Sequence, residues 1–143
     1  MSPDQKIRQL LESRLADWAD EQDPPLQVAY QNAKFEPPAN APYLRVYILR
    51  AKTTAPDLAG EMRTRLGILQ ISVVGVEHTG PRQAEEIAGV LEDLYPANLR
   101  LEDEEGFVVQ IIEPGSFGPS LPGDGRYIQP ISFSYRSDIL LSA

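Results

Sequence analysis

The feature that most constrains the fold is an alternation of apolar and polar residues with a period of two. In the stretch 68–76, Leu69, Ile71 and Val73 share one face of an extended chain. Gln70 and Ser72 share the other face. β-Branched residues in this pattern predict a half-buried strand. The same pattern recurs in 43–50, 107–112 and 127–136, which predicts a sheet with one apolar face and one largely polar face.

Two segments have the apolar spacing of amphipathic helices. The first follows Ser2-Pro3, where Ser2 and Gln5 suit a capping box, and it stops before Asp23-Pro24-Pro25. The second follows Gly80-Pro81 and stops at Pro96. Two helices can cover only one face of the sheet. We therefore expect an α+β fold in the order α-β-β-β-α-β-β-β, with a mostly antiparallel sheet and both helices packed on one face.

The composition narrows the function classes. A chain of 143 residues is expected to form one domain, here residues 1–143. It has no cysteine, which excludes a disulfide framework, a thiolate zinc site and a cysteine nucleophile. The net charge of −8 disfavours binding of DNA by the chain as a whole, although an acidic surface suits a passage through which DNA slides. No signal peptide or membrane span is predicted, so we expect a soluble, intracellular protein.

The candidate chemical sites are weak. His78 is the only histidine, and Glu77 is its one neighbouring acid, so we expect a solvated loop residue and no metal site. The run Glu102–Glu105 lacks the spacing of a calcium loop and predicts a turn. The glycine-rich segment 114–126 lacks the Gly-Lys-Ser/Thr ending of a phosphate loop. We therefore expect neither catalytic, cofactor-binding nor metal-binding residues, and no enzyme.

Two connections and one proline carry further expectations. Residues 53–61 and 114–126 are predicted to be long loops, and the second is expected to be mobile in an isolated subunit and ordered by a neighbour. Proline is tolerated mainly on edge strands or at bulges. We therefore expect the last strand, which contains Pro130, to lie near an edge of the sheet.

Six segments together resemble a known family. They are IRQLLESRL at 7–15, FEPP at 35–38, PYLRV at 42–46, GILQISV at 67–73, GP at 80–81 and YIQPISFSYRSD at 127–138. In this order and spacing, the pattern resembles the tail-terminator-like proteins of long-tailed bacteriophages and prophages. The resemblance extends over nearly the whole chain.

The resemblance implies a structural role in virion assembly. Such proteins form a ring, usually a hexamer, that caps the tail tube at its head-proximal end and offers the head–tail joining surface. The implied partners are the tail tube and head-completion proteins, while DNA passes through without specific binding. The implied location is the cytoplasm of the bacterial host during assembly, and then the virion tail. No membrane or cofactor is implied.

Two alternatives stay open: another head–tail connector or tail-completion protein, and a small-molecule-binding α+β domain that uses Glu77 and His78. For the ring we predict a subunit interface made of the following residues: Arg45, Tyr47, Arg63, Arg65, Phe117, Leu121, Asp124 and Arg126.

Overall fold

The computed structural model describes residues 1–55, 62–123 and 125–140. It has two helices, α1 (Pro3–Asp20) and α2 (Arg82–Leu94). Eight strands accompany them in the described part: β1 (Gln27–Ala29), β2 (Tyr43–Arg50), β3 (Met62–Val74), β4 (Arg100–Glu102), β5 (Val108–Ile111), β6 (Ser116–Phe117), β7 (Leu121–Gly123) and β8 (Arg126–Leu140). The α+β prediction is confirmed.

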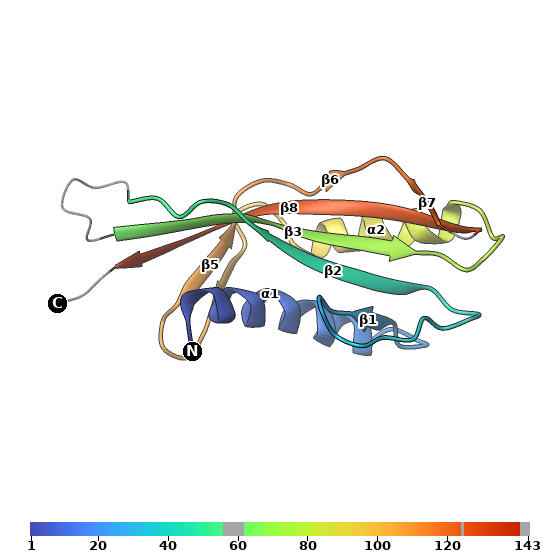
Figure 1. Ribbon diagram of the computed structural model, residues 1–143, viewed down its shortest axis with the longest axis horizontal. Helices are drawn as coiled ribbons and strands as arrows, with labels where there is room; N and C mark the ends of the chain where they lie inside the picture. The colour runs from blue at the N-terminus through green and yellow to red at the C-terminus, as the bar shows by residue number, and fades with distance from the viewer. Residues whose placement is uncertain (56–61, 124, 141–143) are drawn as a thin grey trace.

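The strands form one sheet in the order β1-β2-β3-β8-β5-β4. Every pairing is antiparallel except that of β1 with β2. The two short strands β6 and β7 pair with β8 on the side away from β3. The long central strands β3 and β8 run side by side and extend beyond the other strands at one end (Figure 1).

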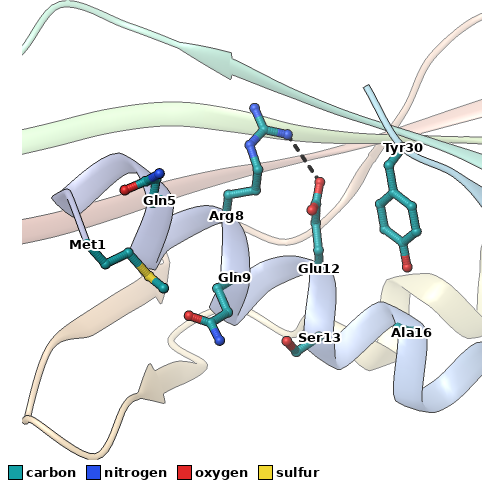
Figure 2. A pocket seen from close by; sticks show the side chains of 8 residues that line it. All are labelled: Met1, Gln5, Arg8, Gln9, Glu12, Ser13, Ala16 and Tyr30. Carbon is teal, nitrogen blue, oxygen red and sulfur yellow. Dashed lines mark hydrogen bonds and ion pairs between the residues drawn. The ribbon is translucent and has the colours of Figure 1, made fainter. Parts of the chain in front are cut away.

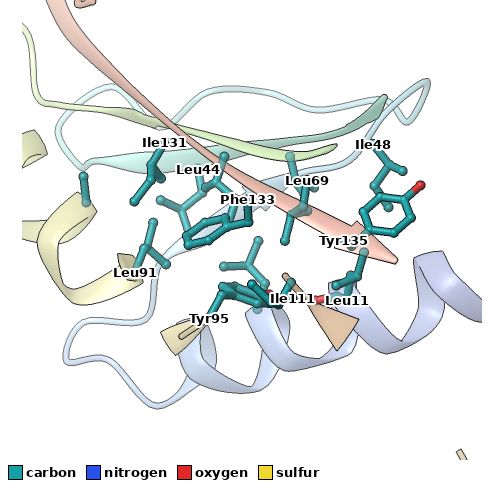
Figure 3. Packing of buried hydrophobic residues seen from close by; sticks show 14 of the residues in the cluster. Leu11, Leu44, Ile48, Leu69, Leu91, Tyr95, Ile111, Ile131, Phe133 and Tyr135 are labelled. Atoms are coloured by element: carbon teal, nitrogen blue, oxygen red, sulfur yellow. Dashed lines mark hydrogen bonds between the residues drawn. The ribbon is translucent and has the colours of Figure 1, made fainter. Parts of the chain in front are cut away.

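Both helices lie on one face of the sheet. α2 packs on β3 and β8, and α1 contacts β1, β4 and β5. Side chains from both helices and from the inward positions of the strands form one buried cluster (Figure 3). Its fully buried members include Leu11 of α1, Leu91 of α2 and Phe133 of β8. The alternation in the sequence therefore placed the apolar face correctly.

The start of α1 is fixed by the predicted capping box. The Gln5 backbone N–H donates to Ser2 Oγ over 3.2 Å, and the Ser2 N–H donates to Gln5 Oε1 over 2.8 Å. These two bonds satisfy amide groups that the first turn of a helix leaves without partners.

A side chain closes part of the outer edge of β2. β1 pairs only with residues 43–45, so the later residues of β2 have no strand beside them on that side in the described part of the chain. Gln31 Oε1 accepts a hydrogen bond from the Ile48 N–H over 2.9 Å and is held by Arg8, also at 2.9 Å. A backbone donor that a further strand would use is thus already occupied.

Segment 114–126 differs from the prediction of a loop, because it contains β6 and β7. The backbone of β8 continues past the reach of β5, and its free groups pair with this segment. Glycine permits that approach: a Cβ on Gly115 would lie 2.7 Å from the Phe133 ring. Asp124 lies outside the described residues. The predicted mobility of the segment stays a prediction.

The expectation that Pro130 marks an edge strand is wrong, because β8 lies between β3 and β5 in the sheet. The backbone explains why proline is tolerated. The Pro130 carbonyl accepts from the Gly118 N–H over 3.0 Å, so the Pro130 nitrogen points to the same side, away from β3. On that side the chain passes from β6 to β7, and no ladder bond is lost to β3.

Residues 53–61 were also predicted to be a long loop. Thr54 pairs with Thr64 of β3, so the described part of this connection runs along the projecting end of β3. Residues 56–61 lie outside the described residues.

Candidate assembly surfaces

The face of the sheet opposite the helices, here called the outer face, is built from the alternate residues of β2, β3 and β8. Because the strand register is fixed by pairing, these residues form rows across the sheet. The first row holds Tyr43, Val74, Ile128 and Leu121; the second Arg45, Ser72, Pro130 and Gly118; the third Tyr47, Gln70, Ser132 and Ser116; the fourth Leu49, Ile68, Ser134 and Ile112; and the fifth Leu66, Arg136 and Gln110.

The first row is covered by the chain's own loop. Phe35 packs on Tyr43, with ring centroids 5.2 Å apart, and joins a small buried cluster with Val74 and Ile128. Arg126 holds this loop in place. Its guanidinium donates to the carbonyls of Pro38, Ala41 and Gly75 at 2.6–2.9 Å. The sequence predicted a largely polar face, but one end of it is a second, small core.

The fourth row, here called the apolar row, is open to solvent. Leu49 lies beside Ile68, Ile68 lies beside Ser134, and the Ile112 N–H donates to the Ser134 carbonyl over 2.9 Å. The side chains of Leu49, Ile68 and Ile112 are 49%, 39% and 38% exposed. Large apolar side chains gathered on an open sheet face are a common mark of a protein–protein contact.

The structure brings only part of the predicted interface together. Arg45 and Tyr47 lie on the outer face, in the second and third rows. Arg63 and Arg65 lie on the helix side of the projecting end of β3, at the same positions of the pleat as the buried Leu69. Arg65 contacts Asp4 at 3.4 Å and Thr53 at 3.3 Å. Its Nε is buried without a hydrogen-bond partner among the described residues.

The remaining predicted residues follow the β6–β7 edge. Phe117 and Leu121 are 48% and 45% exposed. The register places Phe117 beside Ile131, on the helix side, and Leu121 beside Ile128, on the outer face. Arg126 donates hydrogen bonds to three backbone carbonyls of its own subunit. These contacts give it a structural role that requires no neighbouring subunit. Asp124 lies outside the described residues.

A hollow of about 470 Å³ lies on the exposed side of α1 (Figure 2). Arg8 and Glu12 pair across one helical turn at 3.1 Å, and Tyr30 closes one end. Burial raises the pKa of Glu12, although the neighbouring Arg8 opposes this shift. A single paired carboxylate in a shallow hollow matches a structural ion pair better than an acid–base centre.

The other chemical candidates also have structural explanations. The His78 side chain is 79% exposed and contacts Glu77 at 3.3 Å. Asp103 Oδ1 accepts the N–H groups of Glu105 and Phe107, so the acidic run forms the turn predicted between two strands. Among residues 1–55, 62–123 and 125–140, no group of three acidic, histidine or cysteine side chains is placed to hold a metal. In the same part of the chain, no helix is long and apolar enough to span a bilayer.

A two-helix, one-sheet domain with an open apolar row fits an assembly role, and the comparisons with known proteins identify the assembly. A family model for phage tail terminator proteins matches residues 6–135. The chain belongs to the phage tail terminator family. This tail terminator therefore has a structural role in the phage tail, interacts with tail components, and is located in the virion tail.

Solved structures share the fold. One chain is 42% identical to this tail terminator, superposes with a TM-score of 0.80, and is matched over 96% of each chain. Seven chains of solved structures match in all. Among curated proteins there is no match.

The sequence reasoning missed the apolar row. Each of its members was correctly assigned to a strand or its end, but Leu49 and Ile112 lie more than 60 positions apart, and β2 and β5 are not adjacent. The signal that could have found the row is a departure from alternation. Leu49 and Ile68 are apolar residues at positions where the pattern requires polar ones.

Proposed function

We propose that this tail terminator forms a closed ring, a hexamer, that caps the head-proximal end of the tail tube and presents the surface to which the head is joined. Residues 1–143 act as one domain in this ring. DNA passes through the centre without specific binding. The tail tube and head-completion proteins are its neighbours. Assembly takes place in the cytoplasm of the bacterial host, for a phage or a prophage.

The observation that carries the proposal is the family match over residues 6–135 together with the open outer face. A sheet covered by helices on one side only leaves a broad surface for a neighbouring copy. Closed rings require heterologous contacts, in which two different surfaces of each subunit meet. The outer face would supply one such surface, and the helix side, on which the predicted residues Phe117, Arg63 and Arg65 also lie, would supply the other.

The net charge supports the passage of DNA. The chain has 21 acidic and 13 basic residues, and a ring of such subunits would repel phosphates and so would not retain DNA in its channel.

Native mass spectrometry across protein concentrations, with and without Mg²⁺, tests the proposal. We expect a closed oligomer of about six subunits, favoured by divalent cations that reduce repulsion between acidic subunits. If the protein alone is monomeric, the measurement is repeated with purified tail tubes, which can act as a template. A chain that stays monomeric on tubes as well would contradict the ring.

A tail-length assay tests the cap. Phage assembled without this protein should carry tubes of uncontrolled length when examined by electron microscopy, because nothing ends polymerisation. Complementation with the intact chain should restore one tail length. Normal tail lengths in its absence would favour the alternative of another connector or tail-completion protein.

A further inference from the structure

We infer that the outer face of one subunit seats the exposed side of α2 of the next subunit, so that a sheet-on-helix contact repeats around the ring. This inference rests on the proposed ring and names the two surfaces that meet in it. The partner is therefore a second copy of this chain.

The outer face is suited to a partner surface that has an apolar centre flanked by acidic side chains. At its centre is the apolar row, with Leu49 and Ile68 side by side. Arg45 and Arg136 lie on either side of this row, in the second and fifth rows. Rows two to five contain no carboxylate among the described residues. This region therefore carries positive charge on a chain whose net charge is −8.

The two arginines differ in what they already bind. Arg45 donates to the Tyr43 hydroxyl over 2.8 Å and has no carboxylate partner in the described part of the chain. Arg136 contacts Asp138 at 3.1 Å on an exposed surface, where ion pairs contribute little and exchange readily. Both guanidinium groups are thus available to an incoming acid.

The exposed side of α2 has the complementary pattern. Val90 is 48% exposed at the centre of this side. Glu86 lies one turn before it and Asp93 one turn after it, and both are exposed. Glu86 pairs with Arg82 at 3.0 Å, but this ion pair lies on an exposed surface, where it contributes little to stability. Gly89 lies beside Val90, and apart from its chain neighbours and the backbone of its own helix no described atom lies within 4 Å of where its Cβ would be. A partner can therefore approach the helix backbone closely at this point.

The two surfaces cannot meet within one subunit, because α2 covers the opposite face of the sheet. A two-fold dimer would match the two surfaces less well. Two outer faces together would place arginines against arginines, and two α2 helices together would place carboxylates against carboxylates. Contact of one surface with the other satisfies both, and the pair of subunits then retains one free surface of each kind, one on each subunit. A heterologous contact of this kind forms a ring when the rotation between neighbouring subunits closes, as the proposed function requires.

Cysteine cross-linking tests the contact, because the chain has no cysteine of its own. Ile68→Cys and Val90→Cys are introduced separately and together at exposed positions, and circular dichroism confirms that each variant folds. With oxidant or a short bis-maleimide, we expect the double variant to give a ladder of covalent oligomers that ends at the ring size. A mixture of the two single variants should give only dimers. Each single variant alone should stay uncross-linked.

A matched control pairs Ile68→Cys with Gln9→Cys, which places the second thiol on the exposed side of α1. This pair should give no ladder, and a ladder from it would contradict the choice of α2. Dimers from Ile68→Cys alone would show that two outer faces meet and would overturn the inference. A ring in native mass spectrometry without a ladder from the Ile68→Cys, Val90→Cys double variant would overturn this contact but leave the ring standing. Absence of both the ladder and the ring, on tail tubes as well, would contradict the proposed function too.

Discussion

Among the described glycines, Gly67 leaves the least room for a side chain. It pairs with Tyr135 across β3 and β8, and the tyrosine ring lies over it. A Cβ on residue 67 would overlap the Tyr135 hydroxyl and the ring carbon that bears it. Gly67→Ala must therefore displace a buried ring. We expect a loss of ~1–3 kcal/mol in the free energy of unfolding, measured by urea denaturation.

Gly89→Ala is the matched control, since Gly89 lies in a helix with open space around it. Alanine is the better helix former by ~1 kcal/mol, so this variant should be as stable as the parent or more stable. Equal losses in the two glycine variants would contradict the explanation based on the Tyr135 ring.

Tyr95 combines a buried hydroxyl with a helix contact. Its hydroxyl donates to the Leu11 carbonyl over 2.7 Å and so joins the end of α2 to α1. Burial raises the pKa of Tyr95 well above its ordinary value, with nearby Arg14 opposing the shift. Tyr95→Phe removes the hydrogen bond and leaves the Leu11 carbonyl buried. We expect a loss of ~1–3 kcal/mol at neutral pH.

The same residue predicts a pH dependence. Since the folded pKa is raised, the contribution of Tyr95 to stability is fully present below the unfolded pKa of about 10 and is lost as the pH rises further. The stability of the parent should therefore fall more steeply than that of Tyr95→Phe above this pH. Burial also raises the pKa of Tyr135, but that effect is common to both proteins and cancels in the comparison. Parallel curves from urea denaturation between about pH 8 and pH 11 would contradict the assignment.

At the scale of elements, Arg126 joins three parts of the chain. It lies at the start of β8, donates to loop carbonyls at Pro38 and Ala41, and reaches Gly75 after β3. Lysine carries a charge but lacks the planar fork that reaches three acceptors. Arg126→Lys should therefore speed amide exchange in residues 35–42 while leaving the central strands protected.

Arg45→Lys serves as the control for that experiment. Arg45 also lies over the Tyr43 ring, at 5.5 Å, but its guanidinium donates to the Tyr43 hydroxyl and not to the loop carbonyls that Arg126 holds. It should change exchange in residues 35–42 much less. A similar effect from both substitutions would contradict the view that the carbonyl bonds of Arg126 hold the loop.

The elements themselves were mostly predictable from the sequence. Alternation identified β2, β3, β5 and most of β8, and spacing with caps identified both helices, because each signal is local. β6 and β7 were missed because they are paired through backbone groups of β8, which no pattern in segment 114–126 reveals. The orientation of the Pro130 nitrogen and the apolar row both depend on strand register, which is a property of the assembled sheet.

At the scale of the whole molecule, the interpretation as a structural protein predicts that His78 is dispensable. It has a backbone φ of 60° and an exposed side chain, and its N–H donates to the Gly125 carbonyl. Asparagine tolerates this conformation better than alanine does. His78→Asn should fold, form the same oligomer and support tails of normal length. A folded His78→Asn protein that no longer supports tails of normal length would favour the small-molecule-binding alternative.

The occupied edge of β2 limits how copies of this chain can associate with one another. Proteins that add strands to one another's open edges grow without a fixed end, as fibres do. Gln31 fills the place on Ile48 where such growth would begin, so copies of this chain are steered toward contacts through their broad faces. The occupied amide on β2 thus disfavours edge-to-edge growth of this protein into a fibre at that edge.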